Sequence, residues 1–252
     1  MDFKYRNKIL SYIKENKEAS IHDIVKLCSI TIPTARKYLN ELNNENLISF
    51  KRGKAIIKTS FYYSNFSRKI NENKELKKQI GEYASSFISN GNTIFIGGGS
   101  TSFYVLENIL KYKNITIVTN SVPVITFVIQ HPEINLIVIG GKWNDRTESF
   151  ESIDTRQLED LYPDISFVGA MGIDINRGVT QNTQMLQQTE FLMFEKSKRS
   201  FILADSTKFN ITYPWTVFPI EKISNIITDN KFDDKYIDIW NKIGVSIFKY
   251  QH

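Results

Sequence analysis

The chain of 252 residues has one cysteine, three histidines, six prolines and no long apolar run. Cys28 cannot form an intramolecular disulfide bond, so we expect a reducing compartment, the cytoplasm. One cysteine and scattered histidines show no metal-ligand spacing, so we expect neither a metal nor a cofactor. The start of the chain lacks the apolar core of a signal peptide. The most apolar stretch, residues 115–129, is interrupted by polar residues and Pro123, which excludes a membrane span.

Positive charge is concentrated in the first quarter of the chain. Residues 1–58 contain 12 Lys and Arg and 6 Asp and Glu, a net charge of +6, whereas the remaining residues carry −1. The length suits one small and one large domain. We therefore expect a small basic domain at 1–58 that contacts a polyanion, with a solvated basic surface as the alternative reading.

The basic segment has the pattern of three short helices. Ile9, Tyr12 and Ile13 have helical spacing, and Ser20 with Asp23 predicts a capping box that begins a second helix. Thr31 caps a third helix, with Pro33 in its first turn. The residues predicted to point inward from this helix are Ile32, Ala35, Leu39 and Leu42. The residues left on its surface are Pro33, Thr34, Arg36, Lys37 and Asn40.

A basic β-hairpin is predicted after these helices, with its turn near Gly53. Its cations are Lys51, Arg52 and Lys54. Three helices and a wing indicate a winged helix-turn-helix, whose third helix and wing would bind double-stranded DNA. The alternative is a small helical interaction module with a basic surface.

The stretch SITIPTARKYLNEL resembles the recognition-helix signature of DeoR-type transcriptional repressors. Thr34, Arg36 and Lys37 stand at the Thr-x-basic-basic positions of that family. Pro33, Ala35 and Tyr38 depart from its usual residues, so the resemblance implies operator binding without implying the operator sequence.

The rest of the chain alternates apolar runs with helical patterns. We expect a connector at 59–74 and a domain at 75–252 with a Rossmann-like, mostly parallel sheet and helices on both faces, an α/β fold. The predicted strands are 93–96, 115–119, 136–139, 165–168, 201–204 and 223–228.

A glycine turn, TIFIGGGSTS, follows the first of these strands. It lacks the third glycine and the later acidic residue of a dinucleotide site, and it lacks the Gly-Lys-Ser/Thr of a P-loop. Ser100, Thr101 and Ser102 are predicted to cap the next helix and, with its N–H groups, to favour an anion such as a small phosphorylated ligand. A plain strand-to-helix turn is the alternative.

Polar or glycine-rich residues follow other predicted strands as well. They are 119–121, 140–141, 169–172 and 205–208. Because parallel strands end at one edge of the sheet, these loops could converge on one pocket.

These loops together resemble the DeoR-type sensor domain, which has the fold of ribose-5-phosphate isomerase and glucosamine-6-phosphate deaminase. The matching segments are GGGSTS, VTNSVPV, IGGKWNDR, FVGAMGIDINRGVT and ILADSTKFN. The resemblance implies a sugar-phosphate effector, with Lys208 as the phosphate-binding cation. The expected effector residues are Gly98, Gly99, Ser100, Thr101, Ser102, Asn120, Ser121, Gly141, Arg146, Gly169 and Lys208.

Four positions depart from the family pattern. Gly97 and Met171 replace acidic residues, Glu190 replaces a lysine, and Asn144 replaces an arginine for which Arg146 could substitute. The pocket therefore binds an unusual ligand or very little. We expect Glu190 either to turn away from the pocket or to select a ligand with fewer anionic groups.

The leading hypothesis is a repressor of carbohydrate genes that a phosphorylated sugar releases from DNA. We expect it to be a homo-oligomer that associates through the sheet domain. The alternatives are an interaction module with a degenerate pocket and a sugar-phosphate isomerase. The histidines lie outside the candidate loops and two acidic positions are lost, so we expect no enzyme activity.

Arg36 and Lys37 are expected to differ in how they contribute to DNA binding. If Lys37 contacts a phosphate, Lys37→Ala weakens binding to all sequences equally and lowers the salt slope by about one unit. If Arg36 reads a base, Arg36→Ala relaxes sequence preference at a cost of about 1 to 3 kcal/mol. Salt titrations on two DNA sequences measure both effects, and unchanged binding in both variants rejects the assignment.

Overall fold

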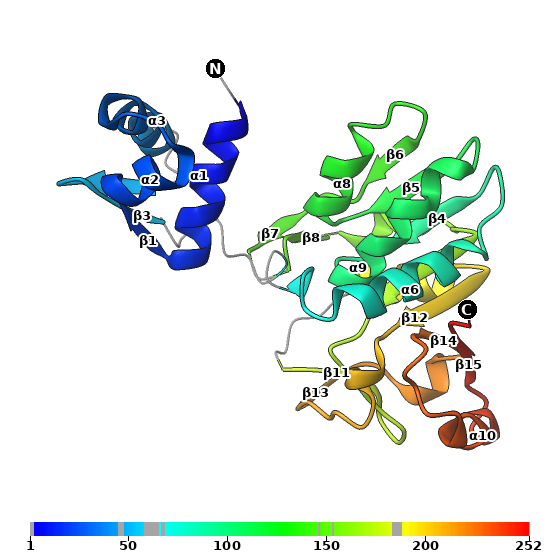
Figure 1. The fold of residues 1–252 in the computed structure, drawn as a ribbon. Coiled ribbons are helices and arrows are strands. Elements are labelled where there is room, and N and C mark those ends of the chain that lie inside the picture. Colours follow the sequence, from blue (N-terminus) through cyan, green and yellow to red (C-terminus); the bar gives the residue numbers. More distant parts are fainter. Residues whose placement is uncertain are drawn as a thin grey trace. The chain divides into compact units, whose positions relative to one another are not determined.

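The computed structural model describes residues 3–44, 48–57, 66, 69–145, 147–152, 154–182 and 188–251. The chain divides into two compact units, Met1–Tyr63 and Ser64–His252 (Figure 1). The connector expected at 59–74 falls across this division, and its described residues, 66 and 69–74, belong to the second unit. Residues 58–65, 67 and 68, which include the first part of the expected connector, lie outside the described ranges.

The first unit is a winged helix. Its elements are α1 (Phe3–Asn16), β1 (Glu18–Ser20), α2 (Ile21–Cys28), α3 (Ile32–Asn44), β2 (Ile48–Lys51) and β3 (Lys54–Ile57). The strands form an antiparallel sheet in the order β1-β3-β2. Ile9, Ile24 and Leu39, one from each helix, are fully buried in a common core.

Local sequence signals explain how these helices begin. The predicted capping box is confirmed: the Asp23 N–H donates to Ser20 Oγ at 3.2 Å, and the Ser20 N–H donates to Asp23 Oδ2 at 2.8 Å. The predicted inward face of α3 is confirmed for Ala35, Leu39 and Leu42. The prediction for Ile32 is wrong. This first residue of the helix is 41% exposed and lines a surface hollow instead of the core.

The wing turns at Arg52 and Gly53. Lys51 pairs with Lys54 across the hairpin, which leaves a two-residue turn. Both turn residues have positive φ, 51° for Arg52 and 77° for Gly53. Such turns match the right-handed twist of the strands, and glycine adopts this conformation without strain.

The second unit is built on a seven-stranded parallel sheet. Its strands are β4 (Thr93–Ile96), β5 (Thr116–Thr119), β6 (Asn135–Val138), β9 (Ile165–Gly169), β12 (Arg199–Leu203), β14 (Asn225–Thr228) and β15 (Ser246–Lys249). Their order is β15-β14-β12-β9-β4-β5-β6, and each neighbouring pair is parallel (Figure 1). The expected α/β fold class, a winged helix-turn-helix followed by a Rossmann-like domain, is confirmed.

Apolar residues alternate between the two faces of this sheet. Ile94 and Ile96 belong to one buried cluster, and Phe95 belongs to the other. The first cluster is covered by α6 (Lys74–Ser85), the 3-10 helix η1 (Tyr104–Lys111) and α8 (Val122–Val128). The second is covered by η2 (Thr155–Leu158), α9 (Gln188–Lys196) and α10 (Ile237–Lys242). Burial on both faces explains why these strands are nearly continuous apolar runs.

Two small antiparallel sheets and the edge strand β15 are absent from the strand predictions. The small sheets comprise β7 (Lys142–Asn144) with β8 (Ser149–Glu151), and β10 (Gly172–Asp174), β11 (Gly178–Gln181) and β13 (Trp215–Phe218). The remaining short elements are α7 (Ser100–Phe103), η3 (Ser206–Lys208), η4 (Ile220–Lys222) and η5 (Asp234–Tyr236). No helix in the described ranges has the length and apolar character that crossing a membrane requires.

The packing of α6 against η1 predicts that Gly81→Ala destabilises the second unit. A Cβ atom at Gly81 would lie 2.5 Å from the carbonyl carbon and oxygen of Tyr104. Backbone atoms cannot swing aside, so we expect a loss of about 1 to 3 kcal/mol in the free energy of unfolding. Gly140→Ala is the control, because a Cβ atom there meets nothing within 4 Å.

All three tryptophans, Trp143, Trp215 and Trp240, lie in the second unit. Their fluorescence during urea unfolding therefore reports on this unit alone. A midpoint for Gly81→Ala at or above that of Gly140→Ala would contradict the predicted clash.

Candidate functional site

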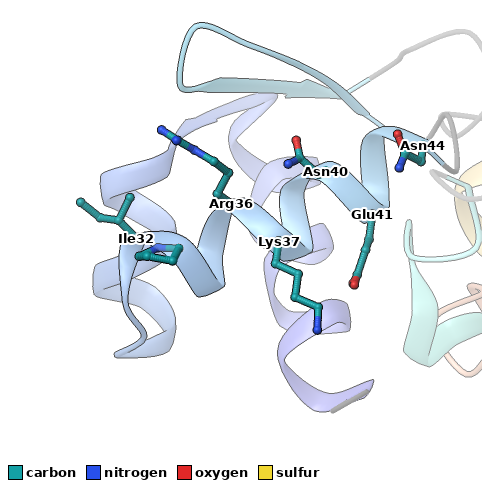
Figure 2. Close-up of a pocket in the computed structure, with 7 residues that line it drawn as sticks. Ile32, Arg36, Lys37, Asn40, Glu41 and Asn44 are labelled. Atoms are coloured by element: carbon teal, nitrogen blue, oxygen red, sulfur yellow. The ribbon is translucent and has the colours of Figure 1, made fainter.

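A basic surface lies on α3. Arg36, Lys37 and Asn40 are exposed and line an open hollow together with Glu41. Figure 2 shows Arg36 and Asn40 extending from one side of the helix and Lys37 and Glu41 from another. This division follows from helical geometry, since residues four apart share a face. Arg36 and Lys37 can therefore meet different parts of a bound duplex.

The other predicted DNA contacts are distributed around this helix and the wing. Thr31 and Pro33 are exposed and Thr34 is half-buried, with its hydroxyl oxygen 2.9 Å from that of Thr31. Lys51 and Arg52 are exposed on the hairpin. Lys54 Nζ lies 2.7 Å from Glu18 Oε1, so part of its charge is already balanced within the protein.

The second unit contains a cavity of about 680 Å³ beyond the carboxyl ends of β4, β5, β9 and β12. The chain passes from β4 outward to β5 and β6, then returns to place β9 on the other side of β4. Loops on the two sides diverge at such a reversal, which is where open α/β sheets bind ligands. The cavity thus lies where the fold favours a site.

The glycine turn after β4 forms one wall of the cavity. Ser102 Oγ donates within the turn, lying 2.8 Å from the Gly97 carbonyl oxygen and 2.9 Å from that of Gly99. A Cβ atom at Gly99 would stand 3.5 Å from the Cα atom of Gly169, so the loops after β4 and β9 nearly touch. The predicted serine and threonine caps are wrong, because Gly99 is the N-cap of α7 and no side chain caps it.

Glu190, on α9, contacts the glycine turn. Its Oε1 accepts the Gly98 N–H at 2.7 Å, and the side chain is only 3% exposed. Burial raises the pKa of Glu190 to about 7, although the Gly98 hydrogen bond opposes the shift. Glu190 lines the cavity and does not turn away from it. One backbone donor that could bind an anionic ligand is therefore already occupied by a carboxyl group.

Lysines gather at another part of the cavity wall. Lys69 and Lys77 come from the start of the second unit, and Lys208 comes from η3 after β12. Asp205 caps η3 by accepting the Thr207 N–H at 3.1 Å, and it also accepts from Asn73 Nδ2 at 3.3 Å. Asn73 is the N-cap of α6, so these bonds join the segment that carries Lys208 to the helix that carries Lys77.

Lys77 is 3% exposed, which is unusual for a lysine. Burial lowers the pKa of Lys77 to about 8, with Asp205 opposing the shift and Lys208 adding to it. Its Nζ donates to the Lys69 carbonyl oxygen. Lys77 and Lys208 therefore lie close enough to repel each other, and an anion between them would relieve that repulsion.

Asn120 contributes an acceptor beside the glycine turn. Its Nδ2 donates to the Phe150 carbonyl oxygen at 2.8 Å, whereas its Oδ1 is buried without a hydrogen-bond partner. Nearby, the Thr119 hydroxyl donates to the Ile96 carbonyl oxygen at 2.6 Å and accepts the Ser121 N–H at 3.0 Å. The Asn120 oxygen is suited to accept from a ligand hydroxyl.

The structure brings together most, but not all, of the predicted effector residues. Those lining the cavity are Gly98, Gly99, Ser100, Thr101, Asn120, Gly169 and Lys208. Those outside its lining are Ser102, Ser121 and Gly141. Ser102 bonds back to its own turn, and a Cβ atom at Gly141 would stand 1.9 Å from the Glu151 carbonyl oxygen, so both serve local packing. Arg146 lies outside the described residues.

Several cavity residues were missed by sequence reasoning. They include Lys69, Lys77, Glu151, Thr180, Gln181 and Tyr213. Lys77 carried a usable signal, since it shares the buried face of α6 with Ile80, Gly81 and Ala84. The others lie on the connector, on the small antiparallel sheets or, for Tyr213, in the loop before β13, and the sequence pattern gave none of them a place. Within the described ranges, no three His, Cys, Asp or Glu side chains form a group that could hold a metal ion.

Family models match both units of the chain. Residues 6–61 match the DeoR-like helix-turn-helix domain, and residues 72–230 match the DeoR C terminal sensor domain. The fold also resembles ribose 5-phosphate isomerase A from Methanocaldococcus jannaschii, at 17% identity over 54% of this chain and 55% of that chain, with a TM-score of 0.41.

Several transcriptional regulators align along most of the chain. The HTH-type transcriptional regulator IolR of Bacillus subtilis is 28% identical, covering 94% of each chain. The L-fucose operon activator of Haemophilus influenzae is 28% identical over 91% of this chain and 93% of that protein. The glycerol-3-phosphate regulon repressor of Escherichia coli is 25% identical over 88% of this chain and 89% of that protein. With both of its domains matched, the chain belongs to the DeoR family of transcriptional regulators.

Proposed function

We propose that this regulator represses genes of carbohydrate metabolism and is released from its operator by a phosphorylated sugar. The observation that carries the proposal is the pair of neighbouring lysines, Lys77 and Lys208, in a cavity that is also lined by many hydrogen-bonding groups. Two cations can hold a phosphate dianion, and hydroxyl, amide and carboxyl groups can hold a sugar. Such a protein acts in the cytoplasm, where the DNA is.

The names of relatives support the link to sugars and leave the direction of control to experiment. One is called a glycerol-3-phosphate regulon repressor and another an L-fucose operon activator. We propose repression because it requires the simplest response to a ligand. The ligand needs only to favour a conformation with lower DNA affinity, which releases the protein from its operator.

We propose that the cavity binds its ligand without converting it. Sugar-phosphate isomerisation needs a base placed at a substrate proton. The positions where the isomerase-like pattern would supply carboxylates are Gly97 and Met171, and Glu190 is held by the Gly98 N–H. Family membership among transcriptional regulators also favours a binding role.

We further propose a homo-oligomer that places two winged helices on repeated half-sites. One winged helix offers few phosphate contacts, and self-association through the second unit would double them. Light scattering at micromolar concentration is expected to give at least twice the 29.2 kDa of one chain. A monomer that still binds its operator tightly would contradict this arrangement.

Lys208→Ala is expected to separate effector response from DNA binding. Operator affinity stays within about twofold of wild type, because the substitution lies in the other unit. Release by the effector is lost, because one of the two phosphate-binding cations is removed. The control is Lys113→Ala, which removes an exposed lysine outside the cavity lining.

The measurement is a titration of operator complexes with a panel of sugar phosphates. Linkage requires operator DNA to weaken effector binding by the same factor by which the effector weakens DNA binding, typically about 5- to 150-fold. If no compound releases the wild type, or if Lys208→Ala is released as readily as Lys113→Ala, the proposed effector site is wrong.

A further inference from the structure

The cavity is electrically asymmetric. Lys77 and Lys208 stand near each other on one part of its wall, whereas Glu190 stands beside the glycine turn. The pKa of Glu190 is shifted by burial and by the Gly98 N–H alone, so none of the lysines shifts it. The carboxyl group is thus a separate electrostatic feature, without a cation of its own in the described structure.

The surroundings of Glu190 hold the group in place. A Cβ atom at Gly97 would lie 3.1 Å from Glu190 Oε1, and one at Gly98 would lie 3.4 Å from the same atom. The carboxyl group therefore fits against a turn without side chains, and even a methyl group at Gly97 would crowd it. This close fit makes it a fixed part of the wall.

The polar groups next to the glycine turn include an amide oxygen and two hydroxyl groups. Asn120 Oδ1 is buried without a hydrogen-bond partner, and Ser100 and Thr101 add hydroxyl groups to the lining. A ligand reaching this end meets a carboxyl group and an amide oxygen, both of which accept hydrogen bonds. Hydroxyl groups satisfy these acceptors, whereas a second anionic group is repelled by the ionised carboxylate.

We propose that Glu190 is a specificity-determining residue: it admits sugar monophosphates whose far end carries hydroxyl groups and rejects those whose far end carries a second anion. In this arrangement the phosphate lies at Lys77 and Lys208, and the hydroxyl-bearing end lies at Glu190 and Asn120. The inference rests on the proposed effector function and names the ligand class of that site.

The test compares matched ligand pairs by isothermal titration calorimetry on the full chain. Each pair is an aldose phosphate and its aldonic acid: glucose 6-phosphate with 6-phosphogluconate, and ribose 5-phosphate with 5-phosphoribonate. The phosphate end is common to both members, so the ratio of their dissociation constants isolates the far end. Wild type is expected to prefer the aldose phosphate by at least tenfold at pH 8.

Glu190→Gln removes the charge and retains an oxygen that can accept the Gly98 N–H. The preference of this variant for the aldose phosphate over the aldonic acid is expected to be at least tenfold weaker than that of wild type, mainly because the aldonic acid binds more tightly. Glu195→Gln is the matched control: it makes the same change on the same helix, where Glu195 pairs with Lys222 at 2.6 Å and does not line the cavity. Its preference should equal that of wild type.

A pH series tests the same point without a substitution. With a pKa of about 7, Glu190 is mostly ionised at pH 8 and mostly protonated at pH 6, so the preference of wild type should shrink as the pH falls. Lys69, Glu72, Lys77, Glu151 and Lys208 also line the cavity, and titration of Lys77 affects both members of a pair through their phosphate. Glu190→Gln should show little change in preference with pH.

The outcomes separate this inference from the function on which it rests. If neither wild type nor Glu190→Gln binds any of the sugar phosphates, both the proposed effector function and the inference that rests on it are rejected. If wild type binds an aldose phosphate but Glu190→Gln and wild type share the same preference at both pH values, Glu190 only supports the turn and the inference alone is overturned. Tryptophan fluorescence confirms that each variant is folded before titration.

Discussion

The parallel pairing of β4 with β9 is the contact on which the cavity depends. Ile94 pairs with Ile165, and Ile96 pairs with Phe167, which places the glycine turn after β4 against the loop after β9. Gly97 extends this pairing by donating its N–H to the Phe167 carbonyl oxygen at 3.0 Å. Because these two loops carry no side chain where they meet, the turn can contact Glu190 of α9 and also line the cavity.

The cavity retains two buried titratable groups that oppose the stability of the fold. Lys77 and Glu190 each lose hydration, and burial moves both pKa values toward the neutral forms. Apolar residues of similar volume would often be at least as stable in such positions. Polar groups that lower the stability of the free protein are common in binding sites, where the bound ligand interacts with them. The Asn120 Oδ1 atom is a further example, because it is buried without a hydrogen-bond partner.

A hydrogen-bond network joins the segments that carry the cavity-lining lysines to the beginning of the second unit. Asn73 donates to both Asp205 and Thr207, at 3.3 and 3.2 Å, and thereby connects the N-cap of α6 with the η3 segment. Tyr104 reaches the same region through a 2.8 Å bond from its hydroxyl to the Ile70 carbonyl oxygen. A phosphate held by Lys77 and Lys208 would therefore act on the part of the sensor unit that follows the winged helix in the chain. Coupling of ligand to DNA needs two states that differ at such contacts.

The sequence by itself determined the elements whose signals are local. Ser20 and Asp23 specify a helix start within four residues, apolar spacing places Leu39 and Leu42 inside, and continuous apolar runs mark most strands of a sheet buried on both faces. The order of loop motifs also indicated the family, and with it Lys208 and the glycine turn. These features depend on neighbours in the chain, so the chain alone reveals them.

Only the tertiary structure decided which side chains face the cavity and how burial shifts the pKa values of Lys77 and Glu190. Ser102 and Lys208 both look like ligand contacts in sequence, yet the Ser102 hydroxyl bonds to its own turn, whereas Lys208 lines the cavity. Glu190 could have faced either way, and its contact with Gly98 joins residues 92 positions apart. Lys77 lies in a strongly polar stretch, and its burial follows from how α6 packs on the sheet. Hydration, charge and hydrogen bonding at these positions depend on groups that the fold brings from distant parts of the chain, which is why local pattern could not settle them.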